Sequence, residues 1–301
     1  MGYIKRTGST HGRRLSRQAV VGVLVTESTG PAARHQVTSM MTAGLSFAAT
    51  ECEAALVVHH VPHIGGMELL HPDQGPPLLR SGMVHGLVLM HRFEPEVVNR
   101  LAERLPCATL AHFVPTAKAD NIDSDHAHSF ALLTDHLYSL GHRKMGFINR
   151  RAQSAITRAR FSSFIQSLRR LDIPWDMDQE LFYPVDGTDA ECDLQISKLV
   201  SLIKGGIRAW LCDSDGTAYR IVRKLIDCGI KVPQDVSVTG YDALEPQYGC
   251  PQICTVRVPF IDMGSTALRR LLLRIEHPSS LPQQIMLRCE LVAGASTGPA
   301  R

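Results

Sequence analysis

The stretch GIRAWLCDSDGTAYRIVRKLIDCGIKVPQDVSVTGYDALEPQYGCPQICTV, residues 206–256, alternates between strand and helix signals. Its segment Ala209–Cys212 is a short apolar run typical of a buried strand, and the acidic loop Asp213–Gly216 follows it. Apolar residues then recur at helical spacing until Gly229, which predicts a helix that ends there. The order strand, acidic loop, helix is that of a βα unit.

A second strand and a second acidic loop follow in the same stretch. Pro233 cannot continue a helix, and Val236–Thr239 is apolar and rich in β-branched residues. A strand that follows such a helix pairs in parallel with the first one, so Gly240-Tyr241-Asp242 reaches the same sheet edge. Ligands of open α/β sheets bind at this edge.

The rest of the chain repeats this alternation, which predicts an α/β fold with parallel sheets covered by helices. We expect strands at 19–25, 54–60, 86–90, 108–113, 144–149, 179–183 and 284–288, and helices at 36–50, 95–105, 128–140, 159–171, 190–204 and 262–274.

The composition describes a globular chain with a basic start. Its 301 residues, 44% of them hydrophobic, can bury a large core and suggest two domains. Residues 1–18 contain five basic residues, Arg13, Arg14 and Arg17 among them, and no acid, whereas the remainder has 27 basic and 29 acidic residues. A basic arm on a near-neutral body predicts that the arm alone contacts a polyanion, and the alternative is an ordinary solvated terminus.

The sequence suggests neither a cofactor nor a metal centre. The eight cysteines are scattered without a CxxC, as expected of reduced cytoplasmic thiols, and the histidine clusters lack a third ligand at metal spacing. No apolar run is long enough to span a membrane, and no secretion signal is visible. We therefore expect a cytoplasmic protein.

Two long motifs resemble those of the LacI/GalR family of bacterial transcription regulators. The run CGIKVPQDVSVTGYD, residues 228–242, is similar to the family signature G-x-x-V-P-x-D-[VI]-S-V-x-G-[FY]-D. Upstream, HLYSLGHRKMGFI at 136–148 resembles H-L-x-x-x-G-H-[RK]-x-[IM]-x-[FL]-I. Residues 251–256 and 290–297 resemble the motifs P-x-L-T-T-V and L-V-x-R-x-S-T, although Cys254 and Gly294 depart from them.

The resemblance implies a two-lobed fold of the type I periplasmic-binding-protein kind, in which each lobe is a parallel sheet with helices on both faces. It places residues 19–123 and 258–284 in an N-terminal lobe, and residues 124–257 and 285–301 in a C-terminal lobe. Residues 1–18 would be a basic hinge segment that joins the sensor to a helix-turn-helix domain. No such domain is expected within residues 1–301.

The function that the resemblance implies is ligand-dependent control of transcription. The chain would be a homodimer that binds a small effector such as a sugar, nucleoside or other metabolite. Operator DNA would be bound by the full-length regulator, and Arg13, Arg14 and Arg17 alone would give this chain weak, non-specific DNA contact. The alternative is a free solute-binding protein of the same fold that serves a transporter. The motifs of common enzyme classes are absent, so we expect no catalysis.

The resemblance also assigns effector contacts. Arg160 matches the arginine of the family's R-x-x-G-F motif, Asp242 matches the aspartate of G-[FY]-D, and Ser214-Asp215 matches an N-D pair, while Asp125 matches an aspartate between the lobes. At the ends of predicted first-lobe strands, Glu27, Ser28, His91 and Arg92 are weaker candidates. For Asp215 helix capping is an equal alternative, Asp242 could stabilise its own turn, and Arg160 could brace its own helix.

Overall fold

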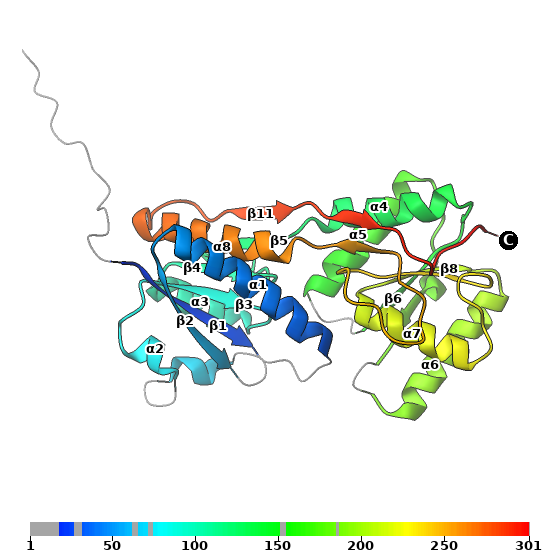
Figure 1. The fold of residues 1–301 in the computed structure, drawn as a ribbon, viewed down its shortest axis with the longest axis horizontal. Helices are drawn as coiled ribbons and strands as arrows, with labels where there is room; N and C mark the ends of the chain where they lie inside the picture. The colour runs from blue at the N-terminus through cyan, green and yellow to red at the C-terminus, as the bar shows by residue number, and fades with distance from the viewer. Residues whose placement is uncertain are drawn as a thin grey trace, which may run out of the picture. The chain divides into compact units, whose positions relative to one another are not determined.

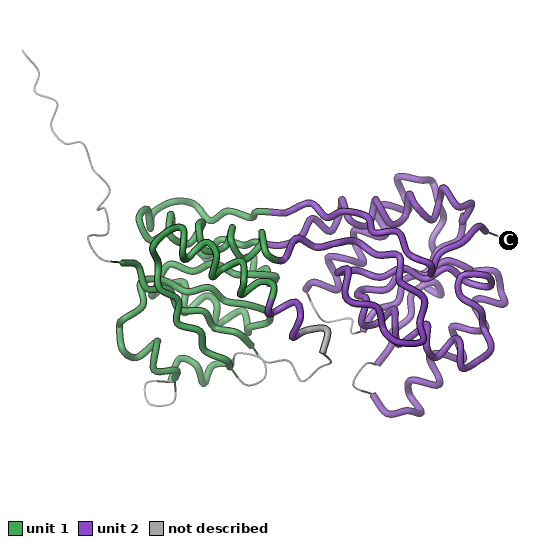
Figure 2. The backbone as a smooth tube through the Cα atoms, viewed as in Figure 1, with its two compact units in different colours: residues 1–29, 40–122, 261–285 green, residues 30–39, 123–260, 286–301 purple. Residues whose placement is uncertain are grey.

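The computed structural model describes residues 18–26, 32–61, 66–71, 75–150, 155–184 and 187–300 (Figure 1). These residues form two compact units (Figure 2). Unit 1 takes its described residues from 1–29, 40–122 and 261–285, and unit 2 takes them from 30–39, 123–260 and 286–301. Residues 32–39, which the sequence-based boundaries place in the first lobe, group with unit 2.

A six-stranded sheet in the order β11-β5-β4-β3-β1-β2 is the centre of unit 1. Its pairs from β5 to β2 are parallel, with Val23 of β1 opposite Val58 of β2 and Val88 of β3. The strands are β1 (Val20–Thr26), β2 (Ala55–Val61), β3 (Gly86–Met90), β4 (Cys107–Leu110), β5 (Asp120–Ser124) and β11 (Gln284–Leu287). Because helices cover this sheet, β3 is buried along its whole length and reads as a continuous apolar run.

The helices of this part of the chain are α1 (Ala32–Glu51), α2 (Pro77–Arg80), α3 (Pro95–Arg104) and α8 (Phe260–Glu276), with a 3-10 turn, η1, at Met67–Leu70. Helices α1 and α8 approach each other too closely for a side chain at either of two positions. A Cβ at Gly44 would lie 1.9 Å from the Ile261 carbonyl oxygen, and a Cβ at Gly264 would lie 2.1 Å from the Met41 carbonyl oxygen. Two glycines therefore make this contact possible.

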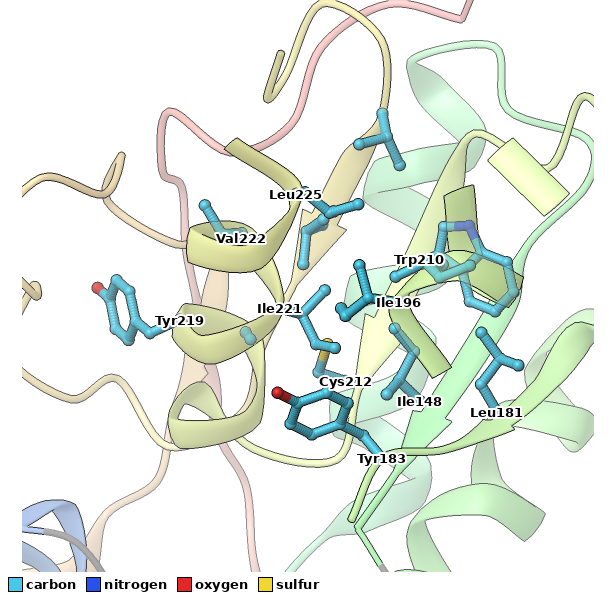
Figure 3. Close-up of a cluster of buried hydrophobic side chains, with 14 of the residues drawn as sticks. Ile148, Leu181, Tyr183, Ile196, Trp210, Cys212, Tyr219, Ile221, Val222 and Leu225 are labelled. Atoms are coloured by element: carbon cyan, nitrogen blue, oxygen red, sulfur yellow. The ribbon is translucent and has the colours of Figure 1, made fainter. Parts of the chain in front are cut away.

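Unit 2 is built on a four-stranded parallel sheet in the order β7-β6-β8-β9. The strands are β6 (Gly146–Asn149), β7 (Glu180–Phe182), β8 (Ala209–Cys212) and β9 (Ser237–Thr239); the helices are α4 (His126–Ser139), α5 (Ala155–Arg170), α6 (Asp189–Lys204) and α7 (Asp215–Asp227), with a 3-10 turn, η2, at Met177–Gln179. One buried cluster joins β8 to α7, with Trp210, Ile221 and Leu225 among its members (Figure 3).

Three strands escape the sequence-based prediction. Strand β5 has the polar sequence DNIDS, yet it is fully buried. Strands β10 (Thr255–Arg257) and β12 (Glu290–Val292) form a separate antiparallel pair beside the parallel sheet of unit 2.

The α/β class with parallel sheets is confirmed. None of the described helices combines the length and apolar character needed to span a membrane.

Candidate functional site

Arg160 is the centre of a buried charged cluster within unit 2. It lies on the buried face of α5 and is only 9% exposed. Its Nη1 donates a hydrogen bond to the Asp213 carbonyl oxygen, and its Nη2 lies 3.6 Å from Oδ1 of Asp242. The guanidinium carbon lies 3.7 Å from the centroid of the Tyr241 ring, a cation–π contact. Its Nε is buried and has no hydrogen-bond partner among the described residues.

Asp242 is the carboxylate that Arg160 faces. It follows β9, and its φ of 123° is unusual for a residue with a side chain. Its backbone N–H donates to the Val256 carbonyl at 3.1 Å, which ties this strained turn to β10. The pKa of Asp242 is raised to about 7, chiefly by burial; Arg160 and Arg150 oppose this shift, and Asp215 and Asp213 add to it.

Asp213 stands between the two arginines of the cluster. Its Oδ2 accepts from Nε of Arg150 at 3.0 Å, and its Oδ1 accepts from the Thr217 hydroxyl at 2.7 Å. Because Asp213 directly follows β8, the strand places its carboxylate and its carbonyl beside α5. The end of the strand thus contributes a charge as well as an acceptor for Arg160.

Ser214 and Asp215, which the motif predicts as effector contacts, form hydrogen bonds with other residues of unit 2. Ser214 is the N-cap of α7 and accepts from the Thr217 N–H at 3.3 Å. Asp215 is 1% exposed, and its two oxygens accept from the Thr255 hydroxyl and the Leu244 N–H, both at 2.7 Å. A Cβ at position 240 would lie 2.0 Å from the Asp215 carboxylate, so Gly240 leaves room for it. Asp215 thereby holds the loop that carries Asp242.

Three polar side chains surround the Tyr241 hydroxyl. It lies 2.9 Å from the Ser124 hydroxyl, 3.0 Å from Nδ1 of His126 and 3.1 Å from the Ser129 hydroxyl. Burial, with a smaller effect of Arg160, lowers the pKa of His126 to about 3, so this imidazole is neutral. Burial also raises the pKa of Asp123, 3.8 Å from His126 Nε2, to about 6. These groups fix the ring on which Arg160 rests.

The remaining predicted residues lie elsewhere. Asp125 is the N-cap of α4, where it accepts from the His128 N–H at 2.9 Å. His91 follows β3 in unit 1 with a φ of 69° and donates its N–H to the Leu110 carbonyl. Glu27, Ser28, Arg13, Arg14 and Arg17 are outside the described residues. The structure therefore brings together Arg160 and Asp242, with Asp215 supporting the loop of Asp242.

Four members of the cluster were not among the predicted site residues: Asp123, Arg150, Asp213 and Tyr241. Asp213 carried a usable signal, because it is the first acid after an apolar strand. Arg150 likewise directly follows the predicted strand 144–149. Both residues therefore stand at the carboxyl ends of predicted strands, where ligands of α/β sheets bind.

Comparisons with known proteins define the family. Residues 134–297, more than half of the chain, match the family model of the periplasmic binding protein-like domain. The chain therefore belongs to this family. It is 27% identical to the ribose operon repressor of Haemophilus influenzae over 71% of the chain and 64% of that repressor. It is 26% identical to the HTH-type transcriptional regulator reg1 of Streptomyces lividans, over 96% of the chain and 75% of that regulator.

The structural neighbours agree with this assignment. The lac repressor dimer bound to operator and the anti-inducer ONPF matches with a TM-score of 0.73 at 21% identity, over 94% of this chain and 95% of that one. The comparisons confirm the LacI/GalR resemblance and the fold, since the relatives are regulators of this type. They also confirm the expectation of a non-enzyme, because these relatives regulate transcription. The chain spans less than two thirds of the length of the Haemophilus repressor.

Proposed function

We propose that this chain is the effector-binding part of a LacI/GalR-type transcription regulator, with a sugar or a related small metabolite as effector. Family membership supports the proposal, as do relatives that are named as an operon repressor and an HTH-type regulator. The neighbour that binds operator as a dimer supports operator DNA and a second copy of the chain as partners of the full-length protein, which would act in the cytoplasm.

The observation that carries the proposal is the Arg160–Asp242 pair. A buried guanidinium and a partly exposed carboxylate from distant parts of the sequence meet at the end of the unit 2 sheet. A carboxylate accepts hydrogen bonds from paired hydroxyl groups, and a guanidinium donates in a fixed fork. These are the polar groups that recognise a polyol. Further effector contacts from Asp215, Ser214, Asp125, His91, Glu27 and Ser28 stay predictions. No observation favours the transporter alternative, because the relatives are regulators.

The test is a thermal-shift screen of small metabolites followed by calorimetric titration of the hits. A ligand at a hundred times its Kd should stabilise the chain by roughly 2.7 kcal/mol. Arg160→Lys retains the positive charge but removes the planar fork, and we expect it to weaken binding by about tenfold or more.

The matched control is Arg170→Lys on the same helix. Arg170 is half exposed and pairs with Asp135 at 2.5 Å, away from the Arg160 cluster. Its replacement should leave affinity unchanged. Equal affinities of the Arg160 variant and the parent protein, with both folded by circular dichroism, would remove Arg160 from the binding site.

A further inference from the structure

The hydrogen bonds around the Tyr241 hydroxyl determine which nitrogen of His126 carries a proton. Ser129 donates its only hydroxyl proton to the Asp125 carbonyl oxygen at 2.6 Å. It can therefore only accept from the Tyr241 hydroxyl, which lies 3.1 Å away. Tyr241 has then used its one proton, so its oxygen accepts from Nδ1 of His126 at 3.0 Å. Because the imidazole is neutral, a proton on Nδ1 leaves Nε2 as an acceptor.

This unprotonated nitrogen faces a carboxyl group. His126 Nε2 is buried without a hydrogen-bond partner among the described residues, and Oδ2 of Asp123 lies 3.8 Å from it. The other oxygen of Asp123 accepts from the Ser124 N–H at 2.8 Å. An ionised Asp123 places two acceptors opposite each other in a buried setting, whereas a protonated Asp123 can donate to Nε2. Burial also raises the pKa of this carboxyl group to about 6, which favours the protonated form.

The ionisable groups around the Asp123–His126 pair come from three other parts of unit 2. Arg160 on α5 lowers the pKa of both members of the pair, but burial has the larger effect on each. Tyr241 after β9 stays a neutral phenol, since burial raises its pKa. Cys289, whose sulfur lies 3.9 Å from the Tyr241 hydroxyl, stays a neutral thiol for the same reason. The proton of Asp123 is therefore the one that these described groups exchange with solvent near neutral pH.

We propose that a single proton on the Asp123–His126 pair positions Arg160 through the side chain of Tyr241. A direct hydrogen bond needs a shorter separation than 3.8 Å, so the proton draws Nε2 toward Asp123 by roughly 0.8 Å. The other nitrogen of the same imidazole holds the Tyr241 hydroxyl, and the guanidinium of Arg160 lies on the Tyr241 ring. Asp123 and His126 are thus positioning residues. The inference rests on the proposed function only in taking Arg160 as an effector contact.

The proton can be followed without ligand by nitrogen NMR of the isotope-labelled whole chain from about pH 5 to about pH 8. At the upper end we expect His126 to be protonated on Nδ1 alone. Its Nε2 signal should shift with a midpoint near pH 6, where Asp123 titrates, and the Nε–H signal of Arg160 should follow the same midpoint. A proton on Nε2 at the upper end, or signals that do not move, overturns the inference and leaves the proposed function standing. A metabolite screen without hits would remove the proposed function and leave the proton pair intact.

Two substitutions separate this proton from other causes of a pH effect. Asp123→Asn supplies an amide donor to Nε2 at every pH, so both signals should lose the midpoint near pH 6. A midpoint that persists shows that His126 titrates by itself, which overturns the inference. Asp135→Asn changes a half-exposed carboxyl group on α4 and should leave both signals as they are in the parent.

Tyr241→Phe keeps the ring under Arg160 but removes the oxygen that accepts from Nδ1 of His126. We expect the imidazole proton to move to Nε2, beside Asp123, and the response of Arg160 to pH to disappear. An Arg160 response that is the same as in the parent shows that the charge of Asp123 acts directly on the guanidinium, and this result also overturns the inference.

Discussion

Each unit contains one buried ionic cluster, and the two clusters differ in their ratio of guanidinium to carboxyl groups. In unit 1 the fully buried Asp120 accepts from Nε and Nη2 of Arg274 at 3.0 and 2.7 Å, from Nε of Arg270 at 2.9 Å and from the Gln283 N–H at 2.7 Å. Two guanidinium groups surround one carboxylate. The described part of the unit 2 cluster instead contains two guanidinium groups and four carboxyl groups.

The difference lies in how far the hydrogen-bonding capacity is used. Both oxygens of Asp120 are occupied, so this cluster has no capacity left for a ligand. In the Arg160 cluster, Asp242 has no hydrogen bond to its carboxylate within the described part of the chain. A saturated cluster stabilises the fold, whereas an unsaturated one beside a strained turn is where function is expected.

The largest effect should follow from Asp120→Asn. The substitution leaves the guanidinium of Arg274, which is 4% exposed, without its carboxylate, and breaking a buried pair in this way costs about 3–5 kcal/mol. Urea denaturation at pH 7 measures this loss in the free energy of unfolding. A loss under about 1 kcal/mol would show that the two clusters do not differ as described.

Asp242→Asn should instead increase the free energy of unfolding at high pH. Burial raises the pKa of Asp242 from 3.8 to about 7, so the folded protein holds this proton more tightly than the unfolded chain. The associated stability is complete below pH 4 and is lost as the pH rises through 7. Asparagine stays neutral, and the variant should therefore be more stable than the parent at pH 8, by roughly 2–4 kcal/mol, with little difference at pH 4.

The measurement is the difference in unfolding free energy between variant and parent from pH 4 to 8. The charged groups that face Asp242 are Arg160 on α5, Arg150 after β6, and Asp213 and Asp215 around the start of α7. They are unchanged in the variant, so the difference reports Asp242. A variant that is less stable than the parent at pH 8 would mean that the ion pair with Arg160 outweighs the cost of burial.

The sequence predicts the fold where apolar patterning decides it. Strand β8 and strand β3 were predicted with the bounds that the structure has, because both are buried apolar runs. Strand β5 was missed because its polar residues are satisfied by distant partners, Asp120 by Arg274 and Asn121 by Thr109. No periodicity within residues 120–124 encodes these contacts.

The same limit applies to the candidate site. Motif positions identified Arg160 and Asp242, which the structure places side by side. The hydrogen bonds of Asp215 with Leu244 and Thr255 were not predictable, because they depend on segments 29 and 40 residues further along the chain folding back onto α7. The position of the Tyr241 ring under Arg160 likewise follows from packing between α5 and the end of β9.

The smallest effect should come from the exposed pair Asp135–Arg170, which is a reference for both clusters. It joins α4 to α5 at 2.5 Å, but both side chains are about half exposed. Water already solvates these charges in the unfolded chain, salt screens them, and holding two long side chains together costs conformational entropy. We expect a double-mutant cycle of Asp135→Asn and Arg170→Gln to give a coupling energy of about 0.2–1 kcal/mol that falls further in 1 M salt. A coupling as large as that expected for Asp120 would mean that burial is not what separates these ion pairs, and the interpretation of both clusters would then need another cause.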